Sequence, residues 1–149
     1  MYKRILAPVD GSPTSTRGLQ EAIKLAKSPG TVLRLLHVVD ESVLMMNPEA
    51  LAGTADVIDA FVQTGKQCLK NAAALAKRHG IKSDSVLYEN MTGRVADFIL
   101  KEARKWKADV IVMGTHGRRG FSHVLLGSDA EAVVRNATVP VLLVHGKKR

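Results

Sequence analysis

Four residues in the C-terminal third of the sequence have the types and spacing of a phosphate site. Gly114, Gly117, Gly127 and Ser128 form the pattern G-x2-G-x9-G-S in the stretch MGTHGRRGFSHVLLGSDAEAVV. Glycine costs stability within regular structure, so glycines at fixed spacing suggest a backbone that a ligand approaches closely. A helix beginning near Ser128 would add unpaired N–H groups and a partial positive charge, and both favour a phosphate.

The pattern differs from the commoner phosphate loops. Neither G-x-x-x-x-G-K-[ST] nor G-x-G-x-x-G occurs in the chain. Arg118 and Arg119 lie inside the glycine loop, where positive charge suits an anionic ligand. The other basic residues are scattered along predicted helix faces and the C-terminal tail. Together with an aromatic content of 4%, this makes nucleic acid an unlikely partner in spite of the net charge of +8.

The loop belongs to a chain in which short apolar runs alternate with helical patterns. Strands are predicted at residues 3–9, 31–39, 84–90, 109–114 and 139–145. A first helix is predicted from Pro13 to the SPG stop at 28–30. A long helix is predicted to begin after about Gly53 and to end at Gly80, and two more are predicted over 92–108 and 128–137. Such alternation implies parallel strands joined by right-handed crossovers. We therefore expect an α/β fold: one doubly wound domain over residues 1–149, with a five-stranded parallel sheet of order 3-2-1-4-5 and helices on both faces.

This order places two loops together. Ligands of open parallel sheets bind beyond the carboxyl ends of the strands, where the strand order reverses. The segment APVDGS follows the first predicted strand, and GTHGRRG follows the fourth. In the order 3-2-1-4-5 these two loops lie side by side, where the strand order reverses.

The whole chain resembles the universal stress protein family. The resemblance rests on ILAPVDGS, LLHVVDE and the stretch from Met113 to Val144, and it extends to the family's ATP-binding branch, whose signature is G-x2-G-x9-G-[ST]. It implies that Pro8 and Asp10 line the ribose side of a pocket and that the backbone of Val38 meets the adenine ring. It implies that ribose and phosphates are held by Gly114, Thr115, His116, Gly117, Arg118, Gly120, Gly127, Ser128 and Asp129.

Two of these positions need a separate interpretation. Asp10 could accept hydrogen bonds from ribose, help to hold a divalent cation, or cap the helix beside Ser12. Asp129 is expected to contribute its backbone alone, because a carboxylate beside a phosphate is repulsive unless it points away or faces a metal.

The resemblance implies a regulatory protein of the stress response that binds ATP or AMP and acts through nucleotide occupancy and dimerisation. Mg²⁺ or Mn²⁺ could enter through the phosphates. No dedicated base, arginine finger or Walker-type lysine is apparent, so no catalytic residue is assigned. Two alternatives stay open: a slow ATP hydrolase or nucleotidyl transferase, and an interaction module that binds no nucleotide.

Location and assembly follow from other features. Cys68 is the sole cysteine, and no apolar run approaches the roughly 20 residues of a spanning helix, which predicts a cytoplasmic protein without a membrane partner. The last predicted strand lies at a sheet edge and is apolar on both faces. We expect it to pair with a second copy through Val141 to Val144, forming a homodimer that acts on a client protein of unknown identity.

Overall fold

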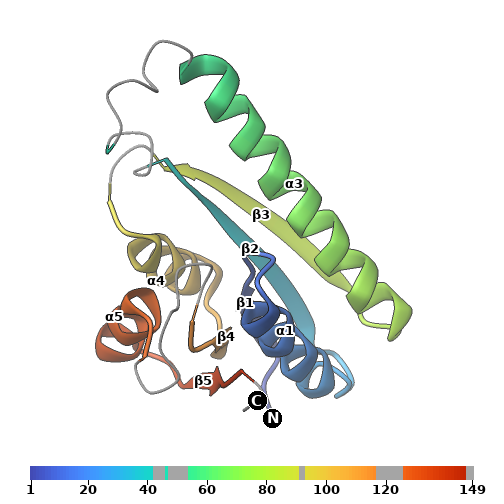
Figure 1. The fold of residues 1–149 in the computed structure, drawn as a ribbon. Coiled ribbons are helices and arrows are strands. Elements are labelled where there is room, and N and C mark those ends of the chain that lie inside the picture. The colour runs from blue at the N-terminus through green and yellow to red at the C-terminus, as the bar shows by residue number, and fades with distance from the viewer. Residues whose placement is uncertain (42–45, 47–53, 91–92, 117–125, 147–149) are drawn as a thin grey trace.

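A computed structural model of the chain describes residues 1–41, 46, 54–90, 93–116 and 126–146. The described elements alternate as the sequence predicts (Figure 1). In chain order they are β1 (Arg4–Pro8), α1 (Pro13–Leu25), β2 (Val32–Asp40), α3 (Thr54–Arg78), β3 (Ser83–Asn90), α4 (Val95–Trp106), β4 (Val110–Gly114), α5 (Ser128–Asn136) and β5 (Val141–Val144).

The five strands form one sheet in the order β3-β2-β1-β4-β5, and every neighbouring pair is parallel. The predicted order is confirmed. The order reverses between β1 and β4, the two central neighbours that pair at Ile5 with Val110 and at Leu6 with Ile111. The loops that follow these two strands therefore begin at the same edge of the sheet.

Helices cover both faces of the sheet, as Figure 1 shows. On one face, α1 and α3 pack on a core that includes Ile5, Leu35 and Val112. On the other face, α4 and α5 pack on a core that includes Leu6, Leu36 and Ile111. Successive residues of a strand point to opposite faces of the sheet. The central strands β1 and β4 are apolar at nearly every position because both of their faces are buried.

The helix boundaries differ slightly from those predicted. The start of α1 is as expected: Ser12 is the N-cap and its hydroxyl accepts the N–H of Ser15. The helix α4 begins at Val95 and not at residue 92, because Gly93 has a φ of 106° that a helix cannot include. Among the described helices, none combines the length and apolar character needed to cross a membrane.

Candidate functional site

A pocket of about 490 Å³ lies at the carboxyl ends of the central strands. This volume is within the range of small-molecule sites. Its lining includes every predicted site residue that the structure describes: Pro8, Asp10, Val38, Gly114, Thr115, His116, Gly127, Ser128 and Asp129. Gly117, Arg118 and Gly120, which were also predicted, lie outside the described residues.

The loop after β1 holds Asp10 at one side of the pocket. The N–H of Ser12 donates to Asp10 Oδ1 at 2.8 Å, and the N–H of Asp10 donates to Ser15 Oγ at 3.1 Å. Gly11 has a φ of 80°, which a side chain would disfavour. Ser12 therefore caps α1 directly, while the Asp10 carboxylate orders the turn that leads into the helix.

The N-terminus of α5 forms another side of the pocket. Gly127 is the N-cap and has no side chain with which to accept a hydrogen bond from the first turn. The first N–H groups of a helix have no partner within the helix. The backbone of Ser128 and its neighbours consequently offers donors and a partial positive charge to the pocket, as an anionic group requires.

The two described glycines of the signature have a structural reason that the sequence did not reveal. A Cβ at Gly114 would lie 2.8 Å from the backbone carbonyl carbon and oxygen of Thr14 in α1, and a Cβ at Gly127 would lie 2.8 Å from Thr115 O. Such distances are too short for any side chain. The chain's own backbone therefore requires glycine at both positions, before any ligand is considered.

Asp129 faces a neighbouring helix. Its Oδ1 accepts the backbone N–H of Ala96, in the first turn of α4, at 3.2 Å. This satisfies one of the unpaired donors of that helix. It also brings the first turns of α4 and α5 together at the pocket.

The structure adds pocket residues that the sequence interpretation missed. They come from the end of β2, from α3 and from the segment before α4: His37, Asp40, Phe61, Thr64, Gly93 and Arg94. Asp40, Gly93 and Arg94 could have been found, because Asp40 ends β2 and the other two follow β3 at the same sheet edge. No signal in the sequence indicated that α3 reaches the pocket.

Two histidines border the pocket in different ways. His37 is buried, and its Nδ1 lies 2.7 Å from the carbonyl oxygen of Val9, which fixes the ring against the loop after β1. His116 Nδ1 lies 3.0 Å from Thr115 Oγ1. The other ring nitrogen of His116 is buried and has no hydrogen-bond partner among the described residues. His116 is thus the pocket histidine with an unused polar atom.

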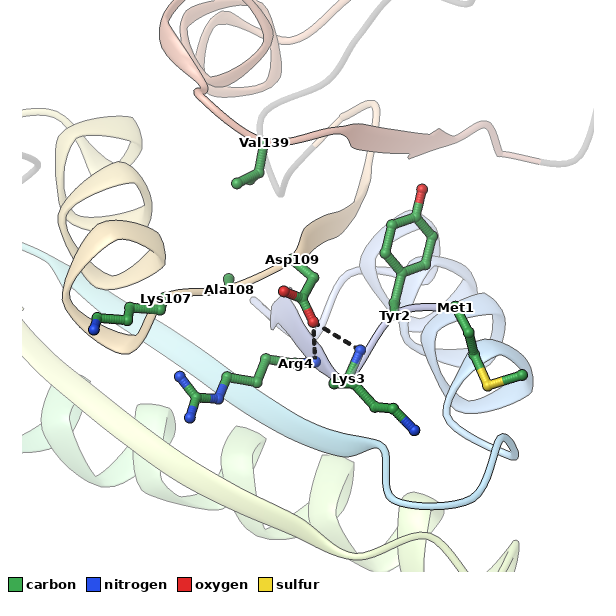
Figure 2. Close-up of a pocket in the computed structure, with 8 residues that line it drawn as sticks. All are labelled: Met1, Tyr2, Lys3, Arg4, Lys107, Ala108, Asp109 and Val139. Atoms are coloured by element: carbon green, nitrogen blue, oxygen red, sulfur yellow. Dashed lines mark hydrogen bonds between the residues drawn. The ribbon is translucent and has the colours of Figure 1, made fainter.

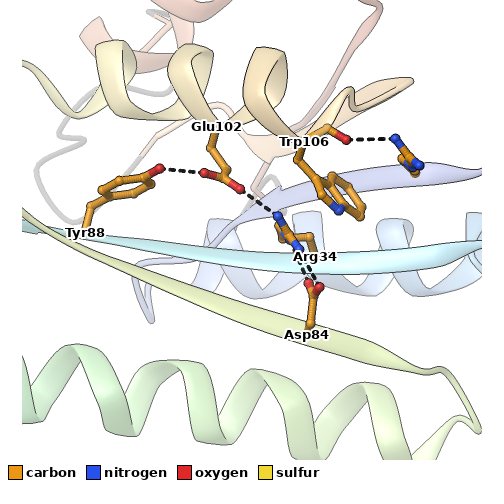
Figure 3. A network of polar contacts seen from close by, with 6 residues as sticks. Arg34, Asp84, Tyr88, Glu102 and Trp106 are labelled. Carbon is orange, nitrogen blue, oxygen red and sulfur yellow. Dashed lines mark hydrogen bonds and ion pairs between the residues drawn. The ribbon is translucent and has the colours of Figure 1, made fainter.

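A polar network holds α4 against the sheet (Figure 3). Glu102, which is buried, accepts hydrogen bonds from Arg34 Nη1 at 2.8 Å and from the Tyr88 hydroxyl at 2.6 Å. Arg34 also donates twice to Asp84, and its guanidinium lies 4.5 Å from the centre of the Trp106 ring. The hydrogen bond to Glu102, with burial, raises the pKa of Tyr88 to about 12. The network positions the helix whose first turn borders the pocket.

A larger depression of about 730 Å³ lies at the opposite end of the sheet, and its chemistry is simpler (Figure 2). The backbone N–H groups of Lys3 and Arg4 donate to one oxygen of Asp109 at 2.7 and 2.8 Å. These bonds lower the pKa of Asp109. The carboxylate thus holds the start of β1 to the start of β4, a structural role that leaves the pocket at the carboxyl ends as the candidate site.

The charges that line the candidate site are mostly negative. Asp10, Asp40 and Asp129 contribute carboxylates, and Arg94 contributes the positive charge of the described lining. Within the described part of the chain, no set of three or more His, Cys, Asp and Glu side chains gathers in a way that could hold a metal ion.

Comparisons with known proteins agree with this fold. The sequence profile of the universal stress protein family matches residues 1–145. The curated universal stress protein MJ0531 of Methanocaldococcus jannaschii is 37% identical over 150 residues, covering 100% of this chain and 85% of the relative. The solved structure of MJ0577, from the same organism, is 28% identical and superposes with a TM-score of 0.86, covering 100% of this chain and 99% of that one.

Two more distant solved structures contain a nucleotide. A universal stress protein in complex with cAMP is 23% identical with a TM-score of 0.69, covering 97% of each chain. The universal stress protein from Archaeoglobus fulgidus in complex with dAMP is 21% identical with a TM-score of 0.69, covering 96% of this chain and 98% of that chain.

Proposed function

The chain belongs to the universal stress protein family, and from this membership we propose that it is a regulatory protein of the stress response that binds an adenine nucleotide. The nucleotide would be ATP or AMP, and binding would occur in a single domain over residues 1–149. Occupancy of the pocket, not chemical turnover, would carry the signal. We place its action in the cytoplasm, since Cys68 is the sole cysteine.

One observation supports this proposal above the others. Nine predicted site residues, drawn from segments far apart in the sequence, line one pocket at the point where the strand order reverses. The first turn of α5 borders the pocket, and the first N–H groups of a helix have no acceptor within the helix, which suits a phosphate. Relatives of the same fold, solved with cAMP and with dAMP, contain ligands that combine adenine with phosphate.

The ligand would lie across the pocket from β2 to α5. The backbone of Val38, whose side chain is buried in the core, would meet the base, and Asp10 would lie beside the ribose. Ser128, the first residue of α5, would hold the phosphates through its backbone N–H, while the N–H of Gly127 donates to Thr115 O at 2.8 Å. A divalent cation such as Mg²⁺ or Mn²⁺ would be bound through the phosphates.

Replacement of Ser128 by Asp tests the phosphate end of the site. Ser128 is exposed and is the first residue of α5, where a negative charge stabilises a helix. The variant should stay folded, yet repulsion at about 4 Å should raise the Kd for ATP about tenfold or more. Gln20→Glu, an exposed position on α1, changes the net charge equally and serves as the control.

Titration calorimetry with ATP and AMP, with and without Mg²⁺, measures these constants. Micromolar binding by the wild type that is weakened in Ser128→Asp and not in Gln20→Glu supports the proposal. Absence of heat from the wild type with both nucleotides under both conditions contradicts it.

Dimerisation through β5 is the second part of the proposal. In the described sheet, β5 pairs with β4 on one side and is the last strand on the other. Val139, Val141 and Leu143 pack against the core beneath α4 and α5, whereas Leu142 is 40% exposed. Pairing of such an edge strand with the same strand of a second copy, across a two-fold axis, would hydrogen-bond its free backbone edge and bury its apolar side chains.

The dimer is tested at the exposed position. Leu142→Lys should yield a monomer by light scattering, because the charge would be buried at the interface. Lysine at Val141 or Leu143 would damage the protomer's own core, so Leu142 is the informative choice. Val32→Lys, which changes a residue of 41% exposure on β2, is the matched control. A monomeric wild type, or a dimeric Leu142→Lys variant, would contradict this interface.

A further inference from the structure

The pocket has an electrostatic imbalance for the ligand proposed above. Three aspartates line it, and Arg94 is the one lysine or arginine in its described lining. A nucleotide brings further negative charge into the same space. The α5 N-terminus offsets part of this charge, and Arg94 is the described side chain that can offset more.

Arg94 lies near the phosphate end of the pocket. It is the N-cap of α4, two residues before Ala96, whose N–H donates to Asp129 in the first turn of α5. Asp129 directly follows Ser128, the residue whose backbone faces the phosphates. The contact between Ala96 and Asp129 therefore places the start of α4, where Arg94 lines the pocket, beside the α5 N-terminus.

The Arg94 side chain is available for a ligand. It is 69% exposed, and its ion pair with Asp97 has an N–O distance of 3.6 Å, with the Asp97 side chain 53% exposed. Ion pairs with this exposure contribute little to stability. A phosphate can accept two parallel hydrogen bonds from a guanidinium, which is a stronger interaction than the exposed ion pair between Arg94 and Asp97. Arg94 can therefore leave Asp97 and bind a phosphate with little loss of protein stability.

We propose that Arg94 is a phosphate-binding residue that makes the pocket prefer nucleotides with more phosphates. The proposal rests on the nucleotide function argued above. The guanidinium acts at the pocket mouth, on the phosphate that lies farthest from the base. Affinity should therefore rise from adenosine to AMP and to ATP partly through this one side chain.

A series of ligands and variants tests the proposal by titration calorimetry. Adenosine, AMP and ATP are titrated into the wild type, Arg94→Met and Arg94→Lys. Arg94→Met should raise the Kd for ATP about tenfold, raise that for AMP less, and leave that for adenosine unchanged. Arg94→Lys should retain most of the affinity because it keeps the positive charge. A small loss is expected because lysine lacks the two parallel N–H donors of the guanidinium.

Arg104→Met is the matched control. It removes the same charge from the same helix, about 15 Å farther along its axis. Arg104→Met should bind all three ligands as the wild type does, and thermal melts should show all variants folded.

Each outcome decides between the proposals. An Arg94→Met variant that binds ATP within twofold of the wild type overturns the role of Arg94 and leaves the nucleotide function standing. Equal weakening of adenosine and ATP, or an equal effect of Arg104→Met, also overturns it. A wild type that binds none of the three ligands overturns both proposals.

Discussion

Replacement of Gly114 by Ala separates two reasons for a glycine in this loop. The added Cβ would lie 2.8 Å from the carbonyl carbon and oxygen of Thr14 and 2.9 Å from its Cγ2. Two of these atoms belong to the backbone of α1, so relief requires the helix to move. The helix is also packed closely against β4 at Gly18, where an added Cβ would lie 2.9 Å from Gly114 N, so its movement is restricted. Overpacking of this kind costs about 2 kcal/mol.

Urea unfolding without nucleotide measures this cost. With a slope of about 2 kcal/mol per M of urea, the midpoint should fall by about 1 M. Gly146→Ala is the control, because its Cβ would meet Thr14 Oγ1 at 3.6 Å, an ordinary contact. Its midpoint should equal that of the wild type. A Gly114→Ala variant with wild-type stability and no nucleotide binding would refute the packing argument, because the glycine would then serve the ligand alone.

Three further outcomes are expected. Because the pKa of Tyr88 is raised to about 12, its contribution to stability is complete below its ordinary pKa of about 10 and is lost as the pH rises through about 12. A difference in unfolding free energy between wild type and Tyr88→Phe that is constant across pH 9 to 12 would contradict this. In Glu102→Gln, a spectroscopic titration should find the pKa of Tyr88 nearer 10. Gly65→Ala should displace His37, since the Cβ would lie 2.7 Å from its Cδ2, and thermal melting should show a destabilised protein whose nucleotide affinity is also reduced. Phosphate release from ATP should stay far below the roughly 1–100 s⁻¹ of kinases, and a steady-state rate within that range would favour the enzyme alternative.

The fold could be predicted from the sequence, and so could the segments that line the candidate pocket. Apolar strands alternate with amphipathic helices along the chain. Such patterns can be recognised from neighbouring residues alone, without knowing which surfaces pack together. The helix start at Ser12 and Pro13 is likewise a short-range signal, and the structure has it. From the strand order, the loops after β1 and β4 had to meet at one edge.

The side chains that complete the pocket, and the packing role of its glycines, became visible in the folded structure alone. Phe61 and Thr64 reach it because the long helix α3 packs over β2 and β3, which no pattern within α3 specifies. Asp129 points to Ala96 because two helix N-termini happen to meet there. Gly114 faces Thr14, a hundred residues earlier in the chain. Each of these contacts joins segments distant in sequence, and their distances are fixed by packing that local preferences do not encode.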